Sequence, residues 1–365
     1  MNQTSSRILH VVGARPNFMK IAPIMRAMTA HPEHFSQLLV HTGQHYDQNM
    51  SKVFFEELQL PQPDINLEVG SGSHARQTAE VMVRFEEVLQ KHRPDWVFVV
   101  GDVNSTMACT LVCAKLGVKV AHVEAGLRSF DRSMPEEINR LVTDQIADLL
   151  FTPSADGDQN LLREGIVRER IHLVGNVMID TLVQLLPAAT ARWPGLRASL
   201  GLDQYALVTL HRPGNVDDST TLAKIVETLR VLSCEIPILF PVHPRTRQRL
   251  AARGQSSTKD FQLIDPLGYL DFLALERHAQ IVLTDSGGVQ EETTYLGVPC
   301  LTIRPNTERP ITITLGTNRL VASQPAAILD AARAALQAGA GKPAQPPPLW
   351  DGHAAQRIVD VMQRL

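Results

Sequence analysis

The stretch DWVFVVGDVNSTMACTLVCAKLGVKVAHVEAG (residues 95–126) decides the fold class. Two short apolar runs, DWVFVVGD and KVAHVEAG, flank the segment NSTMACTLVCAKLG, which has the composition of a helix. Asn104 or Ser105 can cap the start of that helix, and Gly117 can cap its end. Apolar strands that alternate with helices are typical of a parallel sheet. The stretch therefore predicts a strand–helix–strand unit of an α/β protein.

The same alternation extends on both sides of this stretch. The strand candidates are RILHVVG, SQLLVHTG, DWVFVVGD, KVAHVEAG, LLFTPS and RIHLVG, then YALVTLHRP, PILFPVHP, FQLIDP, QIVLTDSGG and PCLTIRP. Two successive α/β series in 365 residues predict two doubly wound domains, residues 1–175 and 176–350. A Gly/Pro-rich connector then leads to a short amphipathic helix within residues 351–365. Its apolar residues available for docking are Ile358, Val359, Val361, Met362 and Leu365.

The composition is that of a soluble globular protein, with 44% hydrophobic residues, 20% charged residues and a net charge of −3. Without a basic excess or a polybasic run, we expect neither nucleic-acid binding nor membrane insertion. The apolar run near the start is too short to span a membrane and lacks a signal-peptide cleavage pattern. The cysteines form no CxxC pair, which favours packing thiols in a reducing cytoplasm over metal or redox use. They are Cys109, Cys113, Cys234 and Cys300.

Acidic residues follow the apolar strands, at the positions where an open α/β sheet builds its sites. Asp102 and Glu124 each follow a strand, and Glu136 and Glu137 start the helix PEEINRLVTDQIADLL. Acids in a first helical turn also favour the helix dipole, and Asp102 could be a helix cap, so each has a structural explanation. Like charges crowded together destabilise a protein unless they are used, so the group predicts a proton-transfer site.

Basic residues follow other strands and suit a phosphorylated ligand. They are Arg15, Lys20, His211, Arg212, His243 and Arg245. The segment LTDSGGVQEETTYLG predicts a strand, a turn and a helix whose free N–H groups could bind an anion, although such turns also simply start helices.

Two apparent motifs carry little weight. GSGSHA (residues 70–75) fits GxGxxA, but the preceding PDINLEV makes a poor buried strand, so we expect no dinucleotide there. HTGQH (residues 41–45) has two histidines four apart, but its glycine and the preceding strand argue against a helical metal pair. No Walker loop, HExxH or GxSxG occurs.

Together the motifs resemble the non-hydrolysing UDP-N-acetylglucosamine 2-epimerases over essentially the whole chain. The matching signatures, in family order, are GARPNFMK, TGQH, GDVNST, HVEAGLRS, MPEEINR, TLHRPGN, PVHPRT, TDSGGVQEE and TERP. The resemblance implies a GT-B fold, with two Rossmann-like domains, a ligand cleft between them, and a last helix that packs back on the first domain. It also implies a cytoplasmic homodimer that interconverts UDP-GlcNAc and UDP-ManNAc for surface-polysaccharide synthesis.

The resemblance also implies roles for individual residues. The catalytic residues it implies are Asp102, Glu124, Glu136 and His211. The ligand-binding residues it implies are Arg15, Lys20 and His243, then Ser286, Gly287, Gly288 and Arg309 at the diphosphate, Glu292 at the ribose hydroxyls, and Leu267 and Phe272 beside the uracil. Activation by UDP-GlcNAc at a neighbouring site would involve Gln44 and His45.

The family reaction gives the strand-end acids a purpose. UDP leaves C1 of the sugar as the C2 proton departs, and 2-acetamidoglucal forms. UDP then adds back while C2 is protonated on the other face. This chemistry needs two opposed proton-transfer groups and stabilisation of the leaving diphosphate, and it requires neither NAD nor a metal.

Several alternatives stay open on the sequence. Relatives that act on 2,3-diacetamido sugars, and hydrolysing relatives that release ManNAc, share most of the motifs. Gly214 stands where many members carry the glutamate of HRxEN, and Ile311 where many carry that of ERPE, so the sugar pocket could differ. A GT-B glycosyltransferase would bind a nucleotide sugar but gives no reason for three strand-end acids. In a non-catalytic sensor the crowded acids would destabilise the protein without serving a function.

Overall fold

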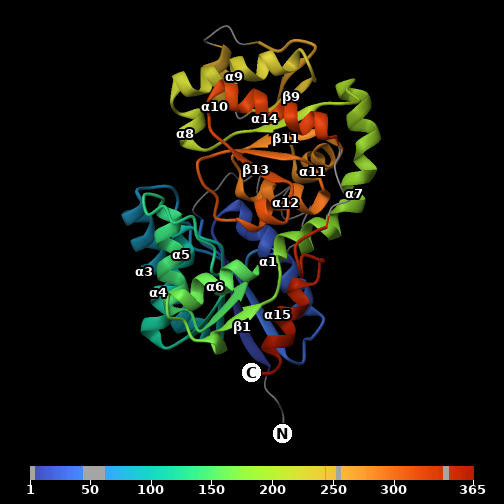
Figure 1. Cartoon of the computed structure of the whole chain (residues 1–365). Helices are drawn as coiled ribbons and strands as arrows, with labels where there is room; N and C mark the ends of the chain where they lie inside the picture. Colours follow the sequence, from blue (N-terminus) through green and yellow to red (C-terminus); the bar gives the residue numbers. More distant parts are fainter. Residues whose placement is uncertain (1–4, 44–61, 243, 252–255, 340–344) are drawn as a thin grey trace. The chain divides into compact units, whose positions relative to one another are not determined.

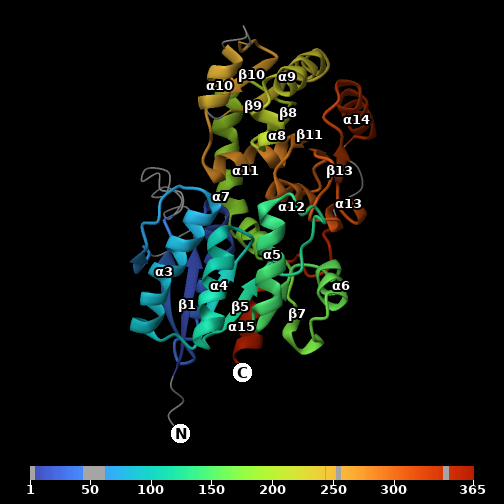
Figure 2. The same ribbon diagram turned by 90° about the vertical axis from the view of Figure 1, so that its left-hand side faces the viewer.

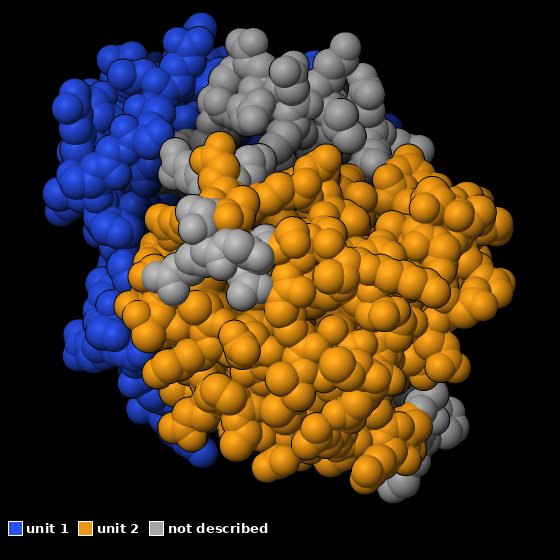
Figure 3. Space-filling model, turned by 90° about the horizontal axis from the view of Figure 1, so that it is seen from above, with its two compact units in different colours: residues 1–181, 348–365 blue, residues 182–347 orange. Residues whose placement is uncertain are grey.

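The computed structural model describes residues 5–43, 62–242, 244–251, 256–339 and 345–365. The chain forms two compact units (Figure 3), here called unit 1 (residues 1–181 and 348–365) and unit 2 (residues 182–347). Among the described residues, no helix combines the length and the apolarity that a membrane crossing needs.

Unit 1 is built on a parallel sheet with the strand order β3-β2-β1-β4-β5-β6-β7 (Figure 1). Its described strands are β1 (Ser6–Val12), β2 (Phe35–His41), β3 (Ile65–Asn66), β4 (Trp96–Val100), β5 (Lys119–Val123), β6 (Leu149–Thr152) and β7 (Ile171–Leu173). Its described helices are α1 (Arg15–Thr29), α3 (His74–His92), α4 (Asn104–Leu116), α5 (Pro135–Ile146), α6 (Ala155–Arg163), the 3-10 turn η1 (Arg168–Arg170) and α15 (Ala354–Met362).

Helices cover both faces of this sheet. Leu9 and Val11 of β1 belong to one apolar cluster with Val81 and Phe85 of α3. Helices α3, α4 and α5 form this layer, and α1 and α15 pack together on the other face (Figures 1 and 2). Burial on both faces explains why β4 is apolar at every position rather than alternating.

Unit 2 repeats this plan with the strand order β10-β9-β8-β11-β12-β13. Its described strands are β8 (Ala206–Thr209), β9 (Ile238–Pro241), β10 (Phe261–Ile264), β11 (Ile281–Thr284), β12 (Cys300–Ile303) and β13 (Asn318–Val321). Its described helices are α7 (Val177–Leu200, which begins in unit 1), α8 (Pro213–Val216), α9 (Ser219–Ser233), α10 (Pro244–Ala251), α11 (Tyr269–His278), α12 (Gly287–Leu296), α13 (Ile311–Thr314) and α14 (Pro325–Ala338).

Strand β8 shows how the second core is divided. Ala206 and Val208 join a cluster with residues of α9 and α14, whereas Leu207 joins a different cluster with Leu275 of α11 and Val289 of α12. The described pairings in both sheets are parallel, which confirms the predicted α/β class. The strand order reverses between β1 and β4 and between β8 and β11, and such switch points are where doubly wound sheets bind ligands.

Helix α7 crosses from unit 1 to unit 2. The sequence predicts the first domain boundary after Gly175, whereas unit 1 ends at Thr181 and unit 2 begins at Leu182. The first turns of α7 belong to unit 1 because Thr181 Oγ1 donates to Met19 O (2.5 Å) and the Asp180 carboxylate binds α15. The chain returns to unit 1 at Pro348 rather than at residue 351.

The last helix packs on unit 1. Ile358, Val359 and Met362 of α15 are buried, and α15 contacts α1. Trp350, which is 2% exposed, donates from Nε1 to Pro153 O at 2.9 Å. The docking prediction for Leu365 was wrong, because the helix ends at Met362 and Leu365 is 70% exposed.

Local details differ from the sequence-based expectations at other positions. Val103, not Asn104 or Ser105, precedes α4 and makes no side-chain cap, whereas Gly117 ends the helix in the left-handed conformation (φ 70°) as predicted. The poor strand candidate PDINLEV contributes the short edge strand β3. Cys234 is exposed at the end of α9, unlike the other cysteines, which are buried.

Candidate active site

The turns after β1 and β4 of unit 1 are joined at the switch point. Asn17 of α1 accepts hydrogen bonds from the backbone N–H groups of Gly13 (3.0 Å) and Ala14 (2.9 Å), and its Nδ2 donates to Val100 O (2.9 Å) at the end of β4. This bridge fixes the start of α1 against β4. It thereby sets the position of Lys20, which lies about one turn further along the helix.

Lys20 and Glu124 are brought together. Both residues are 6% exposed, and Lys20 Nζ forms an ion pair with the Glu124 carboxylate. Glu124 has a φ of 74°, a left-handed conformation that costs energy for a non-glycine residue and marks many active sites. Gly101 approaches this pair so closely that a Cβ there would lie 2.9 Å from Lys20 Nζ. The backbone at Gly101 therefore packs directly against the Lys20–Glu124 pair.

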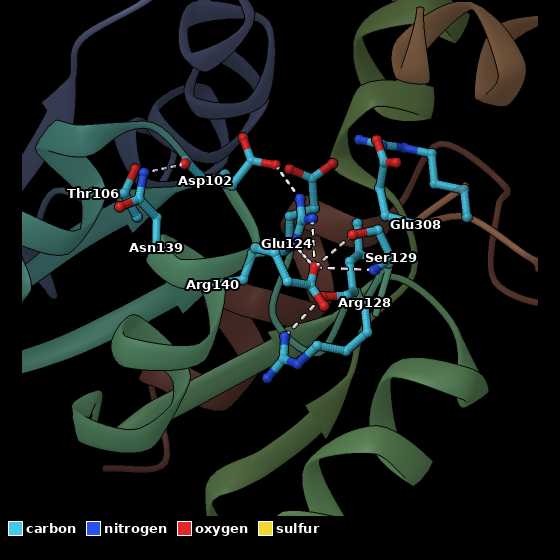
Figure 4. Close-up of polar contacts among 12 residues, drawn as sticks. Asp102, Thr106, Glu124, Arg128, Ser129, Asn139, Arg140 and Glu308 are labelled. Carbon is cyan, nitrogen blue, oxygen red and sulfur yellow. Dashed lines mark hydrogen bonds and ion pairs between the residues drawn. The ribbon is translucent and has the colours of Figure 1, made fainter. Parts of the chain in front are cut away.

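Asp102 belongs to a second charged group (Figure 4). Arg140 of α5 binds Asp102 Oδ2 at 2.5 Å and Glu137 Oε2 at 2.7 Å, and Glu137 also accepts from the N–H and the hydroxyl of Ser129, at 3.0 Å each. Burial raises the pKa of Glu137, but the hydrogen bonds from Ser129 and the Arg140 charge outweigh it and hold that pKa below its usual range. Glu137 is thus a fixed anion that orients Arg140, which differs from the role expected of its neighbour Glu136.

Asp102 and Glu136 line one pocket of about 260 Å³ within unit 1. Asn139 Nδ2 donates to Asp102 O (2.9 Å), and Asn104 Nδ2 donates to Gln77 Oε1 (2.8 Å) beside it. The other polar side chains in the lining are those of Ser71, His74, Gln77, Asn104 and Asn139.

The sequence did not reveal this role of the loop GSGSHA. Its residues Ser71, Gly72 and His74 line the pocket with Asp102, a position that the GxGxxA pattern does not indicate. The loop is close to Asp102 because α3 packs against α4, a contact between segments far apart in the chain. At the pocket, the side chain of Asn104 on α4 contacts two side chains of α3, those of His74 (3.3 Å) and Gln77 (2.8 Å).

His211 lies after β8 at the switch point of unit 2, and Asp285 after β11 orients it. His211 Nδ1 is 3.0 Å from Asp285 Oδ1, and the His211 side chain is 59% exposed. Asp285 also accepts from the backbone N–H of Arg212 (3.0 Å) and from Asn215 Nδ2 (3.0 Å). Burial raises the pKa of Asp285, but these donors and the histidine lower it to below its usual range. The sequence had assigned no role to Asp285, although it follows a strand directly.

The start of α12 offers an anion-binding geometry in unit 2. Ser286 precedes the helix, Gly287 and Gly288 form its first turn, and the first turn holds no acidic residue. A Cβ on Gly287 would lie 2.5 Å from a guanidinium nitrogen of Arg309, so this arginine lies against the helix start. A helix N-terminus and a guanidinium each favour a phosphate group, and Arg309 also forms ion pairs with Glu308 and Glu291.

Glu292 of α12 is buried among other polar groups. Its Oε1 accepts from Tyr269 Oη at 2.8 Å, and burial raises the pKa of Glu292 to about 7. Glu276 of α11, also fully buried, has its pKa raised well above the usual range by burial and by Glu292. Leu267 and Phe272, the predicted uracil neighbours, are half-buried against an apolar cluster of this unit.

Some predicted residues lie outside the described part of the chain. These are Gln44, His45 and His243, together with the side chains of Arg15 and Arg245. Within the described residues, no group of three or more His, Cys, Asp or Glu side chains could hold a metal ion.

Comparisons with known proteins match nearly the whole chain to one family. A family model described as UDP-N-acetylglucosamine 2-epimerase matches residues 26–363. The UDP-N-acetylglucosamine 2-epimerase of Methanocaldococcus jannaschii is 44% identical over 363 residues, covering 96% of this chain and 97% of that protein. The UDP-2,3-diacetamido-2,3-dideoxy-D-glucuronate 2-epimerase of Pseudomonas aeruginosa is 41% identical over 364 residues, covering 98% and 100%. The crystal structure of the M. jannaschii UDP-GlcNAc 2-epimerase in complex with UDP-GlcNAc and UDP matches with a TM-score of 0.89 and 43% identity, covering 98% of this chain and 100% of that one.

Proposed function

This chain belongs to the UDP-N-acetylglucosamine 2-epimerase family, and we propose that it interconverts UDP-GlcNAc and UDP-ManNAc without hydrolysing them. The observation that carries the proposal is the grouping of acids in unit 1. Asp102 and Glu136 line one pocket, and Glu124 follows the neighbouring strand, where it is paired with Lys20. Inversion at C2 needs proton-transfer groups of this kind.

We assign the proton transfers to Asp102, Glu124 and Glu136. One group removes the C2 proton while UDP leaves C1, and another protonates C2 of 2-acetamidoglucal from the opposite face as UDP returns. The Arg140–Asp102 and Lys20–Glu124 pairs support this assignment, because a nearby cation stabilises the carboxylate form that a base requires.

Unit 2 is proposed to hold the nucleotide. The free N–H groups at the start of α12 and the Arg309 guanidinium would stabilise the leaving diphosphate, and His211, oriented by Asp285, would contribute a further donor. Glu292 would bind the ribose hydroxyls, and Leu267 and Phe272 would contact the uracil. The P. aeruginosa relative, at 41% identity, makes a 2,3-diacetamido UDP-sugar the second candidate substrate.

Incubation with each UDP-sugar and no acceptor, followed by NMR of the products, tests the proposal. We expect UDP-GlcNAc to give a mixture with UDP-ManNAc. Free ManNAc and UDP as final products would indicate a hydrolysing enzyme, and turnover of only the diacetamido sugar would indicate the second substrate. An unchanged UDP-GlcNAc sample would contradict the main proposal.

The family resemblance also supports finer proposals. We propose a cytoplasmic homodimer that supplies ManNAc-type sugars for surface polysaccharides and is activated by UDP-GlcNAc through Gln44 and His45.

A further inference from the structure

Four buried or partly buried charged side chains lie next to the ends of β4 and β5, and the mechanism above does not use them. The side chains of His122 on β5 and Asp144 on α5 are both 0% exposed, and His122 Nδ1 lies 2.6 Å from Asp144 Oδ1. Arg128 binds Asp144 Oδ2 at 2.7 Å and Glu164 Oε2 at 2.7 Å. The group therefore holds one histidine, one arginine and two carboxylates.

Hydrogen-bond geometry defines the protonation of His122. Its Nε2 lies 2.9 Å from the carbonyl oxygen of Gly101, which can only accept. Its Nδ1 faces Asp144, which also accepts from Arg128 and from the N–H of Gly126 (3.1 Å). A neutral imidazole has one N–H and one lone pair, so it could satisfy only one of these acceptors. Beside an ionised Asp144, both ring nitrogens therefore have to donate.

The contacts of Asp144 favour its carboxylate form over a form with a proton on Oδ1. Its Oδ2 already receives donors from Arg128 and Gly126. Burial alone would raise the pKa of Asp144, but the His122 and Arg128 contacts more than offset it and hold that pKa below its usual range. With His122 cationic, two cations face two anions and the group is neutral as a whole. A buried charge is tolerated when it is paired in this way.

The contacts of this group reach both acid-bearing turns. Gly101, whose carbonyl His122 binds, directly precedes Asp102. Gly126, whose N–H Asp144 binds, lies two residues after Glu124. Glu124 (φ 74°) is left-handed, a conformation that a non-glycine residue keeps only where its surroundings hold it.

We propose that His122 is a positioning residue of the epimerase, protonated on both ring nitrogens, which with Asp144 fixes the turns that carry Asp102 and Glu124. The part of this inference that concerns the two acids rests on the proposed function. The protonation of His122 does not, because it follows from contacts within unit 1.

NMR of 15N-histidine-labelled protein at about pH 8, where free histidine is neutral, tests the protonation directly. We expect both ring nitrogens of His122 to carry protons, with the signals assigned by their loss in His122→Gln. His10 of β1 is the internal control, since it is equally buried and its Nε2 contacts Gln37 Oε1 at 2.9 Å. Burial lowers the pKa of His10 to about 4, so one of its ring nitrogens should carry no proton. A His122 ring nitrogen that carries no proton would overturn the inference.

Kinetics of His122→Gln test the positioning role, with His10→Gln as the matched control in the same sheet. We expect kcat of His122→Gln to fall about 10²-fold, because small misplacements of catalytic groups have effects of this size. KM and the affinity for UDP should change much less, and His10→Gln should keep its kcat. Asp144→Asn, which retains an acceptor oxygen, should lower kcat in the same direction and serves if His122→Gln does not fold.

A folded His122→Gln enzyme with the kcat of the wild type would refute the positioning role. A wild-type protein that does not epimerise UDP-GlcNAc would contradict the proposed function instead. The NMR experiment needs no substrate, so it decides the protonation of His122 in either case.

Discussion

At the scale of single residues, burial sets the chemistry of several carboxyl groups in different ways. Asp285 and Glu137 are held as anions by the donors around them. Glu292, buried beside Glu276 with Tyr269 as a donor, has its pKa raised to about 7 instead. The donors that surround a buried carboxyl group therefore decide whether it is a fixed anion or can exchange a proton near neutral pH.

Glu292→Gln should weaken UDP binding. Loss of a charge-assisted hydrogen bond to the ribose should cost about 1.5–3 kcal/mol of binding free energy. Because the pKa of Glu292 is about 7, its accepting carboxylate form grows as the pH rises through 7, and wild-type affinity should rise with it. Calorimetry on wild type, Glu292→Gln and the surface control Glu235→Gln checks both effects. Equal UDP affinities across the three proteins would remove Glu292 from the site.

The three assigned acids should each be needed for turnover. Asp102→Asn, Glu124→Gln and Glu136→Gln should each lose at least about 10²-fold in kcat, the size of effect expected for a missing acid or base. Some variants should release 2-acetamidoglucal and UDP, because elimination can continue when re-addition is impaired. Glu86→Gln, an exposed change on α3, is the control. Full activity in all three variants, with UDP binding retained, would contradict the assignment.

At the scale of helices and strands, the sequence predicted the elements well where burial was strong. Strands buried on both faces, such as β4 and β11, were recognised because their apolar runs are uninterrupted. The edge strands β3 and β13 were missed, since β3 has two residues and β13 is only partly buried. The prediction that Leu365 docks was wrong because the spacing of apolar residues does not show where the last turn of the helix ends.

The candidate site was predictable in part for the same reason. Acids that directly follow strands, such as Asp102 and Glu124, could be located because the ends of parallel strands meet at one edge of a sheet. The contributions of His74 and Asp285 were not predicted. They depend on the packing of α3 on α4 and on a contact between the ends of β8 and β11, neither of which has a local sequence signal.

Asp180 of α7 tests the attachment of α15. Its carboxylate accepts from the N–H groups of Ala354 (3.0 Å) and Ala355 (2.7 Å) at the start of that helix. Asp180→Ala should therefore lower the free energy of unfolding of unit 1 by about 1–2 kcal/mol, which urea denaturation can measure. Asp360→Asn on the same helix is the control. Equal stability of Asp180→Ala and wild type would mean that the cap does not hold α15.

The same carboxyl gives a pH dependence of known sign. Burial raises the pKa of Asp180 from 3.8 to about 6, so the folded protein keeps this proton to a higher pH than the unfolded chain does. The part of the stability that is linked to this proton is fully present below pH 3.8 and is lost as the pH rises through about 6. The stability of wild type relative to Asp180→Asn should thus fall across this range. A constant difference in unfolding free energy would contradict the raised pKa.

At the scale of the whole molecule, the two doubly wound units have different proposed roles. Unit 1 carries the acids and unit 2 carries the helix start, Arg309 and Glu292. The likeness to a solved UDP-GlcNAc 2-epimerase, with a TM-score of 0.89, confirms the predicted GT-B fold. An open α/β architecture can carry different chemistries, so the reaction is argued from the residues at the strand ends and not from the fold.

Turnover of UDP-GlcNAc in D2O tests the central claim most directly. If C2 is inverted by loss and return of a proton, the UDP-ManNAc formed must carry deuterium at C2, because the returning proton comes from groups that exchange with solvent. A transient oxidation with internal return of hydride would keep the original hydrogen. NMR of the purified product distinguishes the two outcomes. We predict deuterium at C2, and UDP-ManNAc that forms with only protium at C2 would contradict the account.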